Sequence, residues 1–344
     1  MLLVMLAVLC GSLFAQLPTA TVLGTVNDDS GAVVPGANVT IRNTETGQSR
    51  SATSSADGSY RFNALPVGNY EARVTQQGFE TSVVTGITLT VSQEATINFA
   101  LKVGQIEQQV TVSGGALAVN TESASIGGLV DEQKLADLPL NGRNFADLAL
   151  NETGVVEAKN VGKSAGNSGT MISTNGASHR SNNFLLDGAP MTNLYGSSSA
   201  SIGGSTLGVE GIREFRILTN YFSAEYGMAM GSQVLMVSKS GTNAIHGSAL
   251  EYLRNSKLDA RSFFDKTAEP PPFKRNNFGG SVGAPIKKDK TFIFGTYEGL
   301  EQRLGVTQIS NVLGAGCHGA AGATITQAAC PQLTTASATV SPVV

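Results

Sequence analysis

The residues of this chain that could carry acid–base or metal chemistry are few and widely spaced. The three histidines are His179, His246 and His318, and none of them belongs to an HExxH or similar ligand spacing. Gly203, Gly204 and their neighbours do not form a phosphate-binding loop, because no Gly-Lys-Ser/Thr follows them, and no Ser/His/Asp order indicates a nucleophile. The sequence therefore predicts no catalytic residue, no metal ligand and no cofactor, and we expect a protein that is not an enzyme.

The cysteines point to structural chemistry instead. Cys317 and Cys330 form an even pair near the C-terminal end, and no CxxC motif accompanies them. In an exported protein such a pair predicts a disulfide, and closing a loop of this size stabilises a protein by about 3 kcal/mol. Two free thiols are the alternative. Cys10 lies in an N-terminal apolar segment and is expected to be removed with it.

Residues 1–15 are expected to be a signal peptide. Leu2–Leu9 is an uninterrupted apolar run, and the small residue Ala15 suits cleavage after it. The run is too short for a spanning helix, which needs about 20 residues. No Lys or Arg precedes the run, so we expect the true start to lie upstream of Met1. A buried N-terminal strand is the alternative.

Composition favours a mainly β protein. Forty glycines and 11 prolines in 344 residues indicate many turns and short strands. The formal net charge of -3, with scattered Lys and Arg, gives no reason to expect nucleic acid. No other long apolar run follows the N-terminal one, so a membrane-embedded form would have to be a β-barrel.

Residues 20–101 are expected to form one β-sandwich. Apolar and polar residues alternate clearly in Ala37–Asn43 and Asn69–Gln76, and turn formers such as Asp57-Gly58 separate the segments. The aromatic residues of this part are assigned to its core: Tyr60, Phe62, Tyr70 and Phe79. The seven predicted strands are Thr21–Val26, Ala37–Asn43, Ser49–Thr53, Ser59–Phe62, Asn69–Gln76, Ile87–Val91 and Ala95–Leu101.

Residues 120–243 have a mixed α/β pattern. Asp131 is predicted to cap a short helix that runs to Leu138 and stops at Pro139, and a second helix is predicted over Phe145–Leu150. Gly208–Ile212 is predicted to form a helical turn. The predicted strands are Phe184–Leu186, Phe215–Thr219 and Gln233–Ser238.

Residues 244–304 contain three segments of the length of a tilted barrel strand. These segments are Ile245–Arg254, Asn276–Ile286 and Thr291–Glu301. A long polar connection joins the first two and a short charged turn joins the last two, which is typical of outer-membrane barrels. A soluble antiparallel meander is the alternative. Residues 305–344 are weakly patterned and are expected to be a loop or a disordered end.

The amino-acid sequences of these segments resemble those of known families. GTVNDDSGAVVPGANVTIRNTETG and SADGSYRFNALPVGNYEARVTQQGFE resemble the carboxypeptidase regulatory-like domain, an immunoglobulin-like sandwich that implies a module and not a catalyst. LPLNGRNF, SNNFLLDGAP, EFRILTNYFSAEYG and VSKSGTN resemble, in order, the plug domain of TonB-dependent outer-membrane receptors, closest to their Oar-like branch. The resemblance implies a sandwich, a linker (102–119), a mixed α/β plug (120–243) and the first antiparallel strands of an incomplete transmembrane β-barrel.

The resemblance also implies an energy-coupling partner of the TonB type. In receptors with this N-terminal module a TonB box often follows it, and the matching residues are Glu107, Gln108, Gln109, Val110, Thr111 and Val112. The partner would pair with this extended segment by β-augmentation; a plain linker strand is the alternative. Polar contacts between plug and barrel wall are expected from Arg143, Arg180, Asp187, Arg213, Glu214 and Glu225, with surface ion pairs as the alternative reading.

The function implied is energised uptake of an unidentified ligand across the outer membrane of a Gram-negative-type bacterium. Barrels of this family use about 22 strands, of which three are visible, so we expect the chain to be the N-terminal fragment of such a receptor. The alternative is an exported β-sandwich module that binds carbohydrate or protein without transport.

Overall fold

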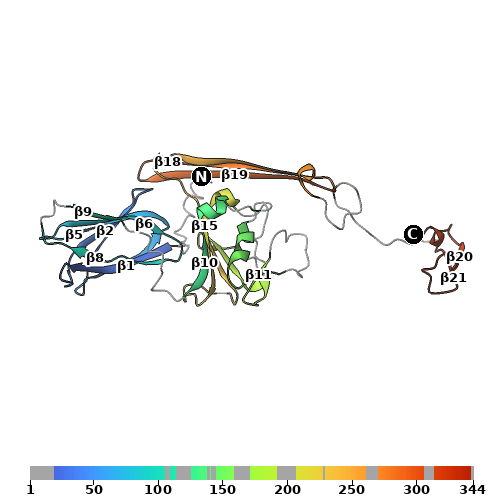
Figure 1. Ribbon diagram of the computed structural model, residues 1–344, viewed down its shortest axis with the longest axis horizontal. Coiled ribbons are helices and arrows are strands. Elements are labelled where there is room, and N and C mark those ends of the chain that lie inside the picture. The colour runs from blue at the N-terminus through green and yellow to red at the C-terminus, as the bar shows by residue number, and fades with distance from the viewer. Residues whose placement is uncertain are drawn as a thin grey trace, which may run out of the picture. The chain divides into compact units, whose positions relative to one another are not determined.

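The structure is a computed structural model in which the described residues are 19–104, 109–113, 125–137, 140, 145–158, 171–191, 207–227, 229–260, 270–305 and 314–341 (Figure 1). The chain divides into two compact units, residues 1–252 with 277–300, and residues 253–276 with 301–344. The described part is mostly β with little helix, which confirms the predicted class. The predicted signal peptide lies outside the described residues.

The N-terminal sandwich consists of two β-sheets that share one core (Figure 1). One sheet has the order β4-β1-β7, with β8 also paired to β1, and the other has the order β3-β2-β5-β6-β9. The strands are β1 (Thr19–Asp28), β2 (Asn38–Asn43), β3 (Ser49–Thr53), β4 (Ser59–Pro66), β5 (Gly68–Thr75), β6 (Thr81–Leu89), β7 (Glu94–Thr96), β8 (Phe99–Leu101) and β9 (Gln109–Ser113).

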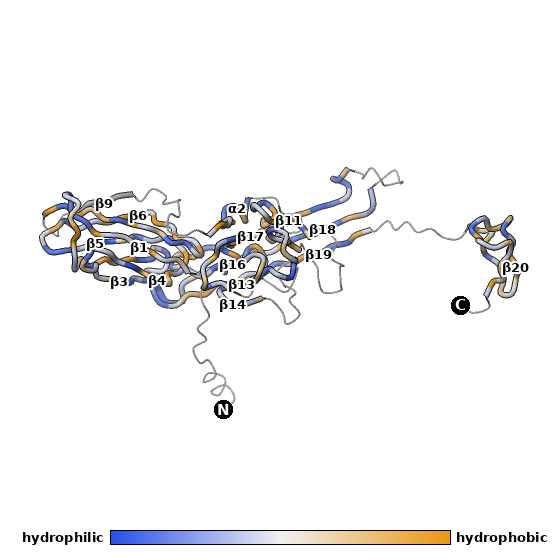
Figure 2. The backbone as a smooth tube through the Cα atoms, turned by 90° about the horizontal axis from the view of Figure 1, so that it is seen from below, coloured by the Kyte–Doolittle hydropathy of each residue, from blue (hydrophilic) through white to orange (hydrophobic). Residues whose placement is uncertain are grey.

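Alternation along the strands places one face of each sheet in this core, and the colours of Figure 2 mark which stretches of the sandwich backbone are hydrophobic and which are hydrophilic. In β2, Val39 and Ile41 are buried and their neighbours are more exposed. Because successive side chains of a strand point to opposite faces, this pattern produces a sheet with one dry side. The predicted sandwich is therefore confirmed.

The aromatic residues predicted for the core are found there. Tyr60, Phe62 and Tyr70 are buried, and Phe79 packs against the cluster while partly exposed. The Tyr60 hydroxyl donates a hydrogen bond of 2.6 Å to the carbonyl oxygen of Ile97. A buried phenol needs such an acceptor, because an unpaired polar group in a core is costly.

Several strands of the sandwich differ from the prediction; β4, for example, continues to Pro66, beyond the predicted end at Phe62. The strand predicted at Ile87–Val91 runs instead from Thr81 to Leu89, because residues 82–89 pair with β5. The strand predicted over Ala95–Leu101 is divided into β7 and β8, which both pair in parallel with β1. The interruption lies at Ile97 and Asn98, which bond to β1 outside the regular ladder.

The plug region follows as a mixed five-stranded sheet of order β10-β15-β16-β13-β14, in which β13 and β16 are parallel. The strands are β10 (Ile126–Val130), β13 (Asn183–Leu186), β14 (Ala189–Pro190), β15 (Ile212–Asn220) and β16 (Gln233–Ser238). A separate pair is formed by β11 (Val155–Glu157) and β12 (Ile172–Thr174). Short 3-10 turns are η2 (His179–Ser181) and η3 (Val209–Gly211), the latter at the predicted helical turn.

Two helical segments pack on the plug sheet. Helix α2 (Glu132–Asp137) begins at the predicted cap, since Asp131 accepts a hydrogen bond of 2.8 Å from the backbone N–H of Lys134. The second segment, η1 (Phe145–Asn151), is a 3-10 helix, and Phe145 packs 5.8 Å from Phe215 of β15 between ring centres. The plug region therefore has the mixed α/β structure that was predicted.

A three-stranded sheet of order β17-β18-β19 follows β16 along the chain. Its strands are β17 (His246–Asn255), β18 (Phe273–Lys287) and β19 (Thr291–Leu304), longer than predicted in the last two cases. Within the described residues this sheet does not close on itself. Large apolar side chains on it are exposed to solvent: Tyr252, Leu253, Phe278, Val282, Ile286, Ile293, Tyr297, Leu300 and Leu304.

The C-terminal residues are more ordered than the predicted loop or disordered end. β20 (Thr324–Thr326) and β21 (Ser337–Thr339) pair antiparallel, and η5 (Ala315–Cys317) precedes them. Cys317 is linked to Cys330 by a disulfide with a Cα–Cα distance of 4.7 Å. The weak sequence pattern hid this order because the cross-link, more than apolar burial, holds the segment.

Candidate functional site

In the described part of the chain, no group of three or more His, Cys, Asp or Glu side chains could hold a metal ion. His246 stacks on Phe294 of β19 with ring centres 6.4 Å apart, and His179 lies in η2. Among the same residues, none of the helices has the length and apolar character needed to cross a bilayer. Polar side chains of the first unit come together where the plug region contacts the β17–β19 sheet and where it contacts the sandwich.

The first of these meeting points joins the plug region to the β17–β19 sheet. Glu298 of β19 accepts a hydrogen bond of 2.6 Å from the backbone N–H of Glu210 in η3. The Glu210 carboxylate in turn accepts a hydrogen bond from the Ser248 hydroxyl of β17. Gly208 lies against Glu298 so closely that a Cβ there would collide with the carboxylate. Two carboxylates and a glycine thus hold one turn of the plug region against the strands.

A second point joins the sandwich to the plug region through an ion pair. Both Nη atoms of Arg213, in β15, donate to the two carboxylate oxygens of Glu45 at 2.9 Å. About a fifth of each side chain is exposed. Burial lowers the pKa of Arg213, but hydrogen bonding to Glu45 and the nearby negative charges outweigh it, so the pKa is raised overall. A bidentate pair of this kind fixes orientation as well as distance.

The neighbouring residue of β15 makes a buried contact with the sandwich. Glu214 is 6% exposed, and its carboxylate accepts a hydrogen bond of 2.5 Å from the backbone N–H of Val91. Burial raises the pKa of Glu214, against the lowering effects of that hydrogen bond and of Arg213 and Arg216. Arg216 donates to the Thr90 hydroxyl at 3.3 Å, and burial lowers its pKa. Both charges are therefore held in a partly dry environment.

An apolar cluster lies beside these charges. Val67 and Val91 of the sandwich pack with Leu218, Leu235 and Val237 of the plug region, and all five are buried. These plug residues belong to β15 and β16. The contact between the two domains thus combines a buried apolar centre with charged groups, an arrangement common to specific interfaces.

The structure describes part of the predicted TonB-box segment. Glu107 and Gln108 lie outside the described residues, whereas residues 109–112 belong to β9. β9 pairs in parallel with β6, from Thr81 opposite Gln109 to Thr85 opposite Ser113. It is the last strand of its sheet. The sequence predicted an extended segment here but not its addition to the sandwich.

The other predicted polar residues of the plug are dispersed. Arg143 lies outside the described residues, and Arg180 and Glu225 are exposed. Asp187 accepts a hydrogen bond of 2.9 Å from the backbone N–H of Ser238 and so fixes the end of β16. Arg213 and Glu214 contact the sandwich, as described above, and contact of the predicted set with the barrel wall stays a prediction.

Sequence reasoning missed the residues that complete these contacts. Glu45 and Val91 lie 168 and 123 positions from their partners, and Glu210 and Glu298 are 88 positions apart. No short-range pattern links such pairs. The nearby sequence signal was the motif VSKSGTN, whose last residue, Asn243, donates through its backbone N–H to the Glu45 carbonyl at 2.9 Å.

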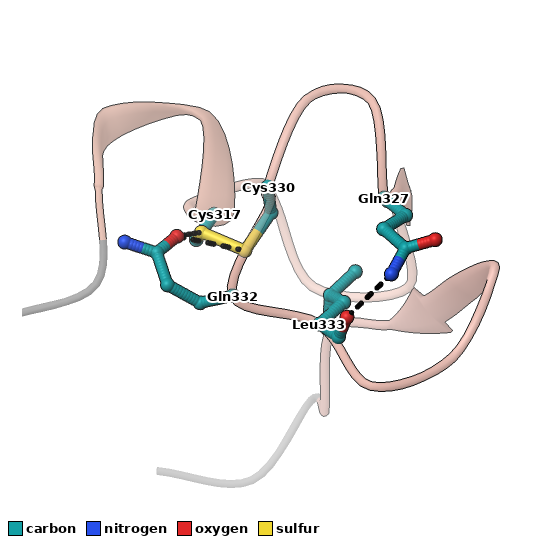
Figure 3. The surroundings of a disulfide bond; sticks show 5 residues. All are labelled: Cys317, Gln327, Cys330, Gln332 and Leu333. Atoms are coloured by element: carbon teal, nitrogen blue, oxygen red, sulfur yellow. Dashed lines mark hydrogen bonds between the residues drawn. A yellow bond between two sulfur atoms is a disulfide. The ribbon is translucent and has the colours of Figure 1, made fainter.

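The disulfide between Cys317 and Cys330 belongs to the second unit (Figure 3). The side-chain oxygen of Gln332 lies 2.9 Å from the Cys317 sulfur and 3.5 Å from the Cys330 sulfur. Gln327 donates to the carbonyl of Leu333 at 2.9 Å and closes the same loop. Cys330 is buried, unlike most of its neighbours.

Comparison with known proteins gives three family matches, one for each part of the chain. Residues 21–102 match the Carboxypeptidase regulatory-like domain, residues 118–232 the TonB-dependent Receptor Plug Domain, and residues 237–342 an Outer membrane beta barrel domain. The TonB-dependent transporter Oar of Myxococcus xanthus is 24% identical over 313 residues, which is 87% of this chain and 28% of the transporter. The chain thus spans less than a third of that relative.

Two solved receptor structures are similar to part of the chain. The siderophore receptor PirA from Acinetobacter baumannii is 22% identical, with a TM-score of 0.37, over 50% of this chain and 24% of PirA. The ferric enterobactin receptor PfeA from Pseudomonas aeruginosa, solved as a mutant, is 15% identical, with a TM-score of 0.34. That match covers 47% of this chain and 22% of PfeA.

Proposed function

We propose that the chain is part of a TonB-dependent receptor and works in an outer-membrane transporter driven by a TonB-type energy-coupling protein, as its three family matches suggest. Its ligand is unidentified. One observation carries the proposal. The α/β plug region continues from β16 directly into a sheet with exposed apolar side chains, and it is hydrogen-bonded to that sheet through Glu210.

The exposed apolar side chains of the β17–β19 sheet support a location in lipid. Large exposed apolar surfaces mark sites of contact with a membrane or a protein, and each strand of this sheet contributes exposed apolar side chains. In the proposed function, the lipid-facing side chains of these strands contact the hydrocarbon of the outer membrane, and further strands complete the wall. The plug region then blocks the pore and is held by polar contacts that can exchange for water during transport.

The strand β9 supports a route for energy coupling. Within the described residues it pairs only with β6 and forms the edge of its sheet, so its other edge carries backbone groups that an added strand can use. In the proposed function, the energy-coupling protein adds a strand along this edge. The predicted signal peptide at residues 1–15 would, in this proposal, direct the chain to the envelope.

Membrane fractionation of the full chain, expressed with its N-terminal segment, tests the location. We expect recovery in the outer-membrane fraction after washing with urea. Ile293→Arg places a charge on an exposed apolar position of β19 and should reduce this recovery, because Arg in a barrel strand costs about 2–4 kcal/mol at the bilayer midplane. Asn38→Arg in the sandwich is the matched control and should leave recovery unchanged. Recovery of the unchanged chain in the soluble periplasm alone would favour the exported binding module.

Substitution in β9 tests the coupling partner. Val110→Pro and Thr111→Pro each remove one backbone N–H, and because successive N–H groups point to opposite edges, one of the two removes a donor from the open edge. We expect at least one of them to abolish cross-linking to the periplasmic domain of a TonB-type protein. Thr111→Ala keeps the backbone donors and should retain cross-linking. Unchanged cross-linking in both proline variants would refute this assignment of β9.

A further inference from the structure

We propose that the sandwich and the plug region form one rigid body, held by an interdomain latch. The latch consists of the ion pair between Glu45 and Arg213 and the hydrogen bond from the Val91 N–H to Glu214. The docking itself does not depend on transport. Only its use in energy coupling, described below, rests on the proposed function.

The ion pair is built to fix an orientation. Its two parallel hydrogen bonds match the planar guanidinium to the planar carboxylate, and this geometry is lost when either plane turns. Glu45 is also held from its backbone, because its carbonyl accepts the N–H of Asn243. The Arg42–Glu71 pair within the sandwich differs, with one contact of 3.4 Å and half of the arginine side chain exposed. An exposed pair of that kind contributes little.

The Glu214 contact anchors the buried part of the interface. The carboxylate and the Val91 N–H are both withdrawn from water, so separating the domains would require both groups to be resolvated. If the carboxylate were removed while the domains stayed together, the N–H would be left buried without a partner. The raised pKa of Glu214 shows that its charge is tolerated here at a cost, which is consistent with a contact maintained for specificity.

Burial of the apolar cluster stabilises the contact between the two domains. Leu218, Leu235 and Val237 are buried together with Val67 and Val91 of the sandwich. Undocking would expose these residues, since they make up the cluster only with both domains present. The latch therefore sets the orientation, and the cluster supplies the attraction.

The order of the elements along the chain suggests how the latch could transmit a pulling force. β9 pairs with β6, β6 ends at Leu89, and the next two residues, Thr90 and Val91, contact β15 of the plug region. In the proposed function, a pull on β9 is passed along β6 and reaches β15 within two residues. A rigid joint at this place would transmit the pull to the plug sheet, whereas a flexible tether would not.

A distance measurement on the full chain tests the rigid body. Spin labels are attached at Asp29→Cys in the sandwich and Val156→Cys in β11, both exposed, in a chain with Cys10→Ser. We expect a single narrow distance distribution. The combined variant Glu45→Ala with Arg213→Ala is expected to broaden it. The matched control is Arg42→Ala with Glu71→Ala, which removes the exposed ion pair and should leave the distribution narrow. A broad distribution in the unchanged chain would overturn the proposal, as would a narrow one in the Glu45/Arg213 variant.

Variants of Glu214 test the second contact independently. Glu214→Gln keeps an acceptor oxygen and should keep the narrow distribution, whereas Glu214→Ala should broaden it. Amide exchange at Val91 should accelerate about tenfold or more in the alanine variant, as expected for loss of a hydrogen bond to a charged group. Circular dichroism checks that each variant is folded. Equal exchange in the two variants would contradict the latch. None of these readouts requires a ligand or an energy-coupling protein, so they can fail while the proposed function stands.

Discussion

The sandwich and the β17–β19 sheet share the same alternation of apolar and polar residues but differ in what covers their apolar side chains. In the sandwich, Val39 and Ile41 are buried by a second sheet of the same domain. In β19, Ile293 and Tyr297 are more than half exposed. Alternation therefore predicts strands in both regions. It does not predict whether another sheet of the protein covers the apolar face, because that depends on residues outside the strand.

The largest expected effect is a loss of stability when a cavity is made beneath the covered sheet of the sandwich. Ile41→Ala should lower the free energy of unfolding of the sandwich by about 2–5 kcal/mol, because the residue is buried and its neighbours cannot fill the space. Urea unfolding followed by circular dichroism measures the change. Ile293→Ala, on the uncovered sheet, should change it by less than about 0.5 kcal/mol in the same assay. Equal losses would mean that the two sheets are covered alike.

The C-terminal segment is a third case, in which a disulfide and not burial beneath a second sheet stabilises the structure. Cys317→Ser together with Cys330→Ser opens a loop closed over 13 positions and should destabilise this segment by about 3 kcal/mol. Hydrogen exchange over residues 314–341 should become fast, and limited proteolysis should cut there. The free energy of unfolding of the sandwich should not change, because the sandwich contains no cysteine. Retained protection in the serine variant would show that packing suffices.

The smallest expected effect concerns the charged contact between sandwich and plug region. Burial raises the pKa of Glu214 above its ordinary value of 4.5, so the folded protein binds this proton more tightly than the unfolded chain does. Its contribution is therefore most favourable below about pH 4.5 and is lost as the pH rises through the raised folded pKa. Glu214→Gln stays neutral, and it should be more stable than the parent at neutral pH with a flatter pH dependence.

Urea unfolding of the parent and of Glu214→Gln across this pH range measures the effect. Glu71→Gln, at a partly exposed position within the sandwich, is the control and should follow the parent curve. Parallel curves for the parent and Glu214→Gln would show that Glu214 is not the source of the pH dependence. In that case the interface with the plug region would behave like an exposed surface and not like a covered one.

Much of the fold was determined by the sequence alone. Alternation and turn residues predicted the sandwich strands, and β16 was placed with its observed bounds at Gln233–Ser238. The cap at Asp131 was also predicted, because capping depends on residues within one helical turn. Such local rules need no knowledge of distant partners. The family resemblance, carried by ordered motifs, predicted the plug region and the β17–β19 sheet.

Only the tertiary structure decided which distant residues meet. Glu45 finds Arg213 and Val91 finds Glu214 because two separately folded sheets dock, and no periodicity within either sheet records that event. The same holds for β9, whose extended character was readable but whose parallel pairing with β6 was not. Contacts between elements far apart in the chain depend on three-dimensional shape and burial, which local sequence patterns constrain only weakly.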